Sequence, residues 1–103
     1  MMRVRVCPAD EVAPGQMKGF AVDSIEWPVL VANVDGVLHA TSSVCPHEDV
    51  SLLEGALAAG CITCPGHAYE FDLASGRCAH DSALTLFRFK TTIVDGDLYV
   101  ELA

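Results

Sequence analysis

Two short cysteine–histidine pairs constrain this 103-residue chain more than any other feature of its sequence. Cys45 and His47 form a C-x-H pair, and Cys64 and His67 form a C-x2-H pair. Sixteen residues, 48 to 63, separate the two pairs. Each pair places one thiolate and one imidazole on a single loop, within reach of a common centre. Two thiolates and two imidazoles suit either one tetrahedral zinc ion or two irons bridged by sulfide.

Proline and glycine surround both pairs. Pro46 follows Cys45 and Pro65 follows Cys64, so each cysteine is succeeded by a residue with a fixed φ and without an amide donor. Gly66 removes a side chain close to the expected metal. Rigid loops of this kind let other backbone N–H groups point at sulfur, which tunes a redox potential. We therefore expect a scaffold that presents two stiff metal-binding loops.

The rest of the chain has the pattern of an all-β protein, with short apolar runs separated by turn residues. Strands are expected at residues 4–6, 17–22, 28–34, 37–41, 87–94 and 98–102. Asp35-Gly36 and Asp95-Gly96 predict two tight hairpins. A single helical turn is expected at residues 10–14, whereas residues 52–59 are too short and too glycine-flanked for a helix.

The charge of the chain is strongly negative and unevenly distributed. Fourteen acidic and six basic residues give a net charge of −8, which argues against binding to nucleic acid. Residues 19–76 hold eight acidic residues and neither lysine nor arginine, so the whole excess lies there. A hydrophobic content of 51% indicates one globular domain. We find no apolar run near the roughly 18 residues of a membrane span and expect a soluble, cytoplasmic protein.

Three further cysteines, Cys7, Cys61 and Cys78, make the cysteine count odd. Because nothing indicates secretion, we interpret them as unligated thiols rather than as disulfide partners. One alternative remains open, since Cys61 and Cys64 form a C-x-x-C pair. A zinc ion could then be held by Cys45, His47, Cys61 and Cys64. Against this alternative, no turn residue stands between Cys61 and Cys64.

Two histidines lie outside the pairs. His39 lies in the first expected hairpin and is interpreted as a structural residue. His80 forms a C-x-H pattern with Cys78 but lacks the neighbouring proline and glycine. We therefore place it at the edge of the metal centre or on the surface.

The residues around the two pairs strongly resemble those of Rieske [2Fe–2S] domains. The similarity covers nearly the whole chain and is greatest to the small ferredoxins of bacterial aromatic-ring oxygenase systems. The residues that carry it are Cys45-Pro46-His47-Glu48-Asp49, Glu54-Gly55, Cys64-Pro65-Gly66-His67, Tyr69-Glu70-Phe71-Asp72 and Ser75-Gly76.

This resemblance implies a fold and a ligand set. The expected fold is a single Rieske domain over residues 1–103, with an antiparallel β-sandwich base at 1–41 and 83–103. A loop-rich cluster-binding subdomain is inserted at about 42–82. One [2Fe–2S] cluster is expected, with Cys45 and Cys64 on one iron and His47 and His67 on the other.

The resemblance also implies a role in electron transfer rather than catalysis. The expected protein is a monomeric carrier that takes single electrons from an NAD(P)H-dependent flavoprotein reductase to a terminal oxygenase of aromatic hydrocarbon catabolism. Both encounters are expected to be transient, and the acidic segment would steer basic patches on these partners. Two alternatives are the small Rieske-like subunit of a nitrite reductase-type system and a zinc-stabilised interaction module.

Several positions bear on the redox potential and on how the cluster is shielded. Tyr69 and Phe71 stand where high-potential Rieske proteins carry serine and tyrosine hydroxyls that bond to cluster sulfur, and the extra loop cysteines of those proteins are absent. We therefore expect a low-potential protein, toward about −150 mV. Ala68 replaces a usual glycine and Gly66 a usual bulky residue. The third loop, 78–83, lacks the proline that commonly shields the cluster.

Overall fold

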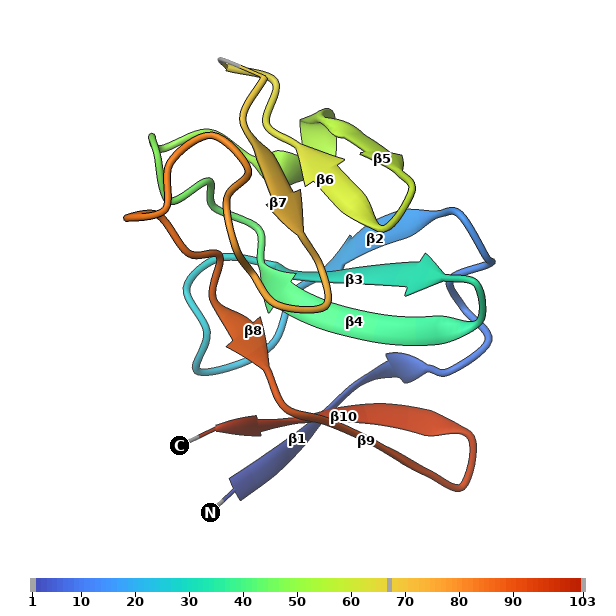
Figure 1. Cartoon of the computed structure of the whole chain (residues 1–103). Helices are drawn as coiled ribbons and strands as arrows, with labels where there is room; N and C mark the ends of the chain where they lie inside the picture. Colours follow the sequence, from blue (N-terminus) through green and yellow to red (C-terminus); the bar gives the residue numbers. More distant parts are fainter. Residues whose placement is uncertain (1, 67, 103) are drawn as a thin grey trace.

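The computed structural model describes residues 2–66 and 68–102, which form three antiparallel sheets (Figure 1). The first has the order β1-β10-β9, the second β2-β3-β4-β8 and the third β5-β6-β7. The strands are β1 (Met2–Pro8), β2 (Met17–Phe20), β3 (Val29–Val34), β4 (Val37–Ser42), β5 (Ala56–Ala58), β6 (Cys61–Thr63), β7 (Glu70–Asp72), β8 (Arg88–Phe89), β9 (Thr91–Val94) and β10 (Asp97–Leu102). A 3-10 turn, η1 (Leu52–Glu54), precedes β5. The all-β prediction is confirmed.

The two predicted hairpins are present. Asp35 and Gly36 join β3 to β4 with φ values of 50° and 90°, and Asp95 and Gly96 join β9 to β10 with φ values of 51° and 81°. Two consecutive left-handed residues make the tight turn whose twist matches that of the flanking strands. Asp-Gly supplies this conformation at little cost, so these two turns follow from local sequence.

Two local predictions are wrong. Residues 87–94 do not form one strand, because β8 pairs with β4 while β9 pairs with β10. The chain passes from one sheet to another at Lys90, and a single straight strand cannot pair with both sheets. The predicted helical turn at 10–14 is replaced by two turns, in which Glu11 N–H bonds to the Pro8 carbonyl and Gln16 N–H to that of Ala13.

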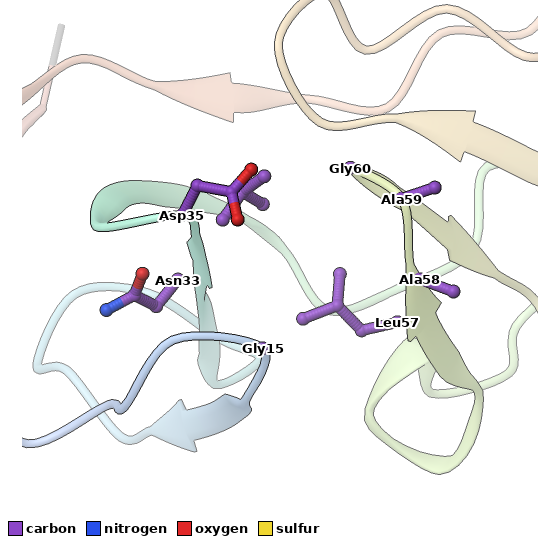
Figure 2. Close-up of a pocket in the computed structure, with 8 residues that line it drawn as sticks. Gly15, Asn33, Asp35, Leu57, Ala58, Ala59 and Gly60 are labelled. Carbon is purple, nitrogen blue, oxygen red and sulfur yellow. The ribbon is translucent and has the colours of Figure 1, made fainter.

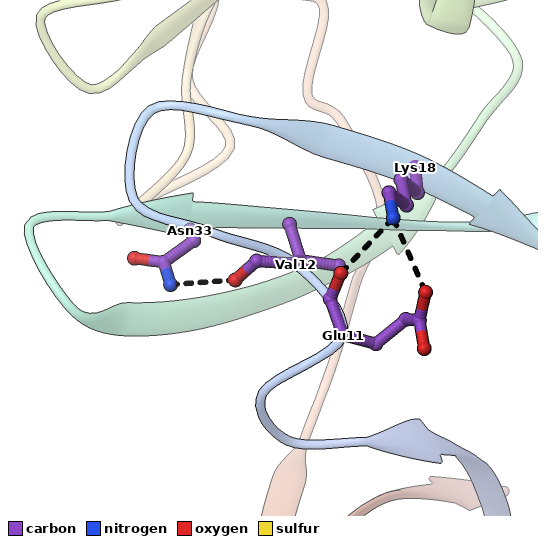
Figure 3. A network of polar contacts seen from close by, with 4 residues as sticks. All are labelled: Glu11, Val12, Lys18 and Asn33. Atoms are coloured by element: carbon purple, nitrogen blue, oxygen red, sulfur yellow. Dashed lines mark hydrogen bonds and ion pairs between the residues drawn. The ribbon is translucent and has the colours of Figure 1, made fainter.

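Asn33 explains why residues 9–16 take these turns (Figure 3). Its buried amide donates from Nδ2 to the Val12 carbonyl at 2.8 Å, and its Oδ1 accepts from the Gly36 N–H at 2.8 Å. Lys18 Nζ donates to the carbonyl and to the carboxylate of Glu11, at 3.1 and 3.2 Å. These bonds to distant residues replace the bonds that a helical turn would have formed within the segment.

Strand β3 is buried on both faces and separates two hydrophobic cores. Val29 and Val31 pack with residues of β1 and β10, whereas Leu30 and Ala32 pack with Ile62, Phe71 and the loops around them. The sheet that contains β3 is therefore a middle layer, with β1-β10-β9 below it and β5-β6-β7 above it in Figure 1. Among the described residues no helix is long and apolar enough to cross a membrane.

Candidate metal centre

The first ligand loop leaves β4 and is closed by its own backbone bonds. The Cys45 N–H donates to the Val50 carbonyl at 3.0 Å, and the Glu48 N–H donates to the Cys45 carbonyl at 3.2 Å. A bridge between Val44 and Ser51 closes the base of the loop. Cys45 and His47 are thus presented from one compact turn, as their spacing predicts.

The second ligand loop joins β6 to β7. The Cys64 N–H donates to the Tyr69 carbonyl at 2.8 Å, and the Ala68 N–H donates to the Cys64 carbonyl at 3.0 Å. Ala68 has a φ of 59°, in the left-handed region that glycine adopts most easily. Alanine adopts this conformation with strain, whereas glycine would adopt it freely.

The structure brings the two predicted cysteine ligands together. Cys45 is 2% exposed and Cys64 is fully buried, both lie in the core above β3, and their thiols form a hydrogen bond. Burial raises the pKa of Cys45 and the Cys64 thiol raises it further. The backbone N–H groups of His47 and Glu48 act in the opposite direction, because they bond to the Cys45 sulfur and favour the thiolate.

His47 is half-buried in the first loop. Its Nδ1 lies 3.8 Å from Glu48 Oε1, and its ring centroid lies 4.2 Å from that of Tyr69 at an interplanar angle of 31°. The fourth predicted ligand, His67, lies outside the described residues.

Within residues 2–66 and 68–102, no three Cys, His, Asp or Glu side chains converge on one metal position. A two-iron cluster with mixed ligands takes two protein residues on each iron, so the buried Cys45–Cys64 pair matches the protein ligands of one iron. The set proposed for zinc, which adds Cys61 to Cys45, His47 and Cys64, lies wholly in this range and is not assembled. Cys61 lies instead in β6, opposite Ala58 and Asp72.

The remaining cysteines and His39 occupy structural positions. Cys7 is buried in the core below β3 and Cys78 in the core above it, and all five cysteines are free thiols. Burial raises the pKa of Cys7 and of Cys61. His39, on β4, has a pKa lowered by burial and by Arg88, against an opposing effect of Asp72.

Glu48 belongs to the motif around the first ligand pair, but the sequence patterns do not predict what its side chain contacts. A Cβ atom on Gly66 would collide with Oε1 of Glu48, so the carboxylate of the first loop occupies the place of a side chain on the second. Gly66 therefore makes room for Glu48. A glycine directly before His67 is the sequence signal that agrees with this contact.

Two aromatic residues complete the surroundings. Phe71 is fully buried in the same core as the two thiols and carries no hydroxyl, as the comparison with high-potential proteins predicts. Tyr69 stacks between His47 and His80, the latter at a centroid distance of 5.6 Å. This contact places His80 at the edge of the site.

One hollow of the surface lies away from the two loops (Figure 2). It has a volume of about 310 Å³ and lies between the end of the β3–β4 hairpin and the β5–β6 turn. Its lining is Gly15, Asn33, Val34, Asp35, Leu57, Ala58, Ala59 and Gly60, which includes none of the predicted ligands. The amide of Asn33 is already committed to Val12 and Gly36. We therefore assign the chemistry to the two loops.

Comparison with known proteins gives consistent matches along the chain. Residues 2–90 match the Rieske [2Fe–2S] domain. The ferredoxin component of the alkene monooxygenase system of Xanthobacter autotrophicus is 32% identical over 98 residues, which cover 94% of this chain and 79% of that protein. The ferredoxin component of biphenyl 2,3-dioxygenase from Rhodococcus jostii is 31% identical over 103 residues, covering 99% and 94%.

A solved structure gives the same result. The complex of reduced oxygenase and oxidized ferredoxin in carbazole 1,9a-dioxygenase contains a chain that superimposes with a TM-score of 0.85 and 29% identity. The match covers 95% of this chain and 91% of that one. Similarity thus extends over both hydrophobic cores and both ligand loops.

Proposed function

Since this chain belongs to the Rieske [2Fe–2S] domain family, we propose that it is a ferredoxin that delivers single electrons to a terminal oxygenase. One observation carries this proposal: relatives that match nearly the full chain are ferredoxin components of oxygenase systems. The protein is accordingly an electron-transfer component rather than an enzyme. Its cofactor is a Rieske-type [2Fe–2S] cluster.

The ligand assignment is part of the proposal. Cys45 and Cys64 hold one iron, and His47 and His67 hold the other. When bound, such a cluster accepts and releases one electron at a time. The residues suit this group, because the two thiols already meet in a buried position with N–H groups of His47 and Glu48 directed at one sulfur. Both N–H groups stabilise negative charge on that sulfur.

The surroundings of the ligands favour a low potential. The apolar core keeps water away from the two thiols, and the position of Phe71 offers no hydroxyl to cluster sulfur. Fewer hydrogen bonds to sulfur leave added negative charge less stabilised, which places the potential toward about −150 mV.

The division of the chain follows from the same assignment. Residues 42–82 constitute the cluster-binding subdomain, and residues 1–41 and 83–103 the base. In support, both ligand loops and the sheet β5-β6-β7 lie within 42–82.

The electron source is an NAD(P)H-dependent flavoprotein reductase, and the carrier acts as a cytoplasmic monomer that meets each partner briefly. The acidic segment 19–76 supports this mode of action, because opposite charge on a partner accelerates a short-lived encounter. The acceptor would then present a basic docking patch.

Spectroscopy tests the cluster. The purified protein is expected to be red-brown, to contain about two irons and about two acid-labile sulfides per chain, and to give a rhombic EPR signal on reduction. Its mean g value should be the low one of mixed histidine and cysteine ligation. A colourless, EPR-silent protein that contains one zinc ion would overturn the proposal.

Kinetics test the role. Reduced protein mixed with an aromatic-ring oxygenase in a stopped-flow instrument should transfer its electron rapidly, while an unrelated acidic [2Fe–2S] ferredoxin serves as the control. The same reduced protein should regain its electron from a flavoprotein reductase with NADH or NADPH. If the protein has an intact cluster but transfers no electron to any of a panel of such oxygenases, the oxygenase assignment is wrong, while the electron-carrier role still stands.

A further inference from the structure

We propose that His80 is a positioning residue for the cluster, which holds the ring of His47 in place through the ring of Tyr69. The inference rests on the proposed function, because it matters only if His47 is a ligand. The inference assigns a role to the third loop, residues 78–83, which carries His80.

The three rings form a continuous stack from the first ligand loop to the surface. The centroid of Tyr69 lies 4.2 Å from that of His47 and 5.6 Å from that of His80, with interplanar angles of 31° and 24°. The side chain of His47 is 26% exposed and that of His80 is 43% exposed. Tyr69 thus contacts two imidazoles, the less exposed one of His47 and the more exposed one of His80.

The third loop is anchored so that His80 keeps this position. The Ala79 N–H donates to the Glu70 carbonyl at 2.9 Å, and Cys78 forms an isolated bridge with Phe71. Cys78 is 8% exposed and belongs to the core that contains the two ligand thiols. The loop that carries His80 is therefore tied to the core that contains Cys45 and Cys64.

The nearest carboxylate to the His80 imidazole belongs to Glu70, the first residue of β7. Nε2 of His80 lies 3.8 Å from Oε1 of Glu70, and both side chains are exposed. This distance is too long for a hydrogen bond, so the ring contact with Tyr69 is the contact that matters for the position of His80.

Tyr69 connects this support to both ligand loops. Its carbonyl accepts the N–H of Cys64 from the second loop, and its ring packs on His47 of the first. Outer partners of this kind orient metal-bound histidines and are as much part of a metal site as the ligands.

The test compares three variants of the holoprotein with the wild type. His80→Ala removes the outer ring, His80→Phe keeps a ring without the imidazole nitrogens, and Ser82→Ala is a control at an exposed position of the same loop. The readouts are the g values of the reduced protein, the midpoint potential and the rate of bleaching in air.

His80→Ala is expected to bleach about two- to tenfold faster, because it loses an aromatic contact beside a ligand. Its EPR lines should broaden and its midpoint potential should shift, while His80→Phe and Ser82→Ala retain wild-type values. A His80→Ala protein with wild-type g values, potential and bleaching rate would overturn the inference, and so would a His80→Phe protein as impaired as His80→Ala. A wild-type protein without the rhombic signal would instead overturn the proposed function and the inference with it.

Discussion

The two hydrophobic cores on either side of β3 are built in different ways. The lower core unites β1, β3, β4 and β10, strands of six or seven residues that contribute mainly valine. The upper core lies under strands of three residues and long loops, and it contains Cys45, Cys64 and Cys78 beside leucine, isoleucine and phenylalanine. The lower core is formed mainly by long paired strands. The upper core is formed by short strands and by the loops that carry the predicted ligands.

Charge is distributed unevenly along the chain as well. Outside residues 19–76, Arg5 pairs with Asp97 at 3.1 Å, and Lys18 pairs with Glu11 at 3.2 Å. Residues 19–76, which include both predicted ligand loops, hold eight acidic residues and neither lysine nor arginine. The basic residues therefore lie outside the segment that carries the predicted ligands.

The largest expected effect comes from replacing one buried cysteine in each core by serine and comparing the iron content of the two variants. Cys45→Ser should abolish the cluster, because it removes one of two ligands on an iron, and the ligand loops should lose their protection from amide hydrogen exchange. Cys7→Ser, in the lower core, should lower the free energy of unfolding by about 1–3 kcal/mol and keep full iron content. Iron analysis and hydrogen exchange by mass spectrometry measure both. Equal iron loss in the two variants would refute the division.

The contact between the two ligand loops should give the next largest effect. Gly66→Ala places a methyl group where the Glu48 carboxylate lies, so the flexible end of Glu48 must turn away and iron binding should weaken about threefold. Glu48→Ala removes the obstacle, and the double variant Glu48→Ala/Gly66→Ala should therefore bind iron as well as Glu48→Ala alone. Iron titration in a chelator competition provides the measurement. Additive losses in the double variant would show that the two residues act separately.

Charge in the acidic segment 19–76 should matter for partners. Glu54→Gln, at an exposed position of this segment, should slow electron transfer to an oxygenase about threefold at low ionic strength, because it removes charge from the segment that has no cations. Asp95→Asn makes the same charge change in the β9–β10 turn and serves as the control. Stopped-flow rates at several salt concentrations give the comparison, and the difference should vanish near 1 M salt. A wild-type rate that does not change with salt would contradict steering.

Ala68 offers a smaller test in the second ligand loop. Because its φ is 59°, Ala68→Gly should relieve strain and raise the free energy of unfolding by up to about 1 kcal/mol. Ala83→Gly, at an exposed position of the third loop, is the control and should not stabilise. Urea unfolding of the holoprotein measures both, and a destabilised Ala68→Gly would show that the strain is absent.

The smallest effect concerns His39, which lies where the two halves meet. Burial and Arg88 lower its pKa in the folded protein, so below the usual pKa of about 6.5 the unfolded chain binds more protons than the folded one. Its neutral form therefore supports folding above this pH, and the support is lost as the pH falls. His39→Gln should reduce the loss of stability between about pH 8 and about pH 5.5. An unchanged pH profile would contradict this assignment.

The parts of the fold that could be predicted depend on short stretches of chain. The Asp-Gly turns identify two hairpins, and the cysteine–histidine spacing identifies two ligand loops. Residues 61–64 have a β pattern, but the sheet β5-β6-β7 as a whole is not predictable, because strands of three residues show no clear period and its first turn is Ala59-Gly60. Here alanine adopts a φ of 52°, a conformation that local propensity does not predict for alanine.

By itself the sequence determined the proposed metal-binding residue types, their spacing and the all-β class, because these depend on neighbours along the chain. Only the tertiary structure decided that Cys45 meets Cys64 and not Cys61, that Glu48 fills the space beside Gly66, and that the ring of His80 contacts that of Tyr69. Each of these contacts joins segments that approach one another only when the sheets pack against β3. The choice of the proposed ligands therefore rests on local information, whereas the contacts around them depend on how distant segments share one core.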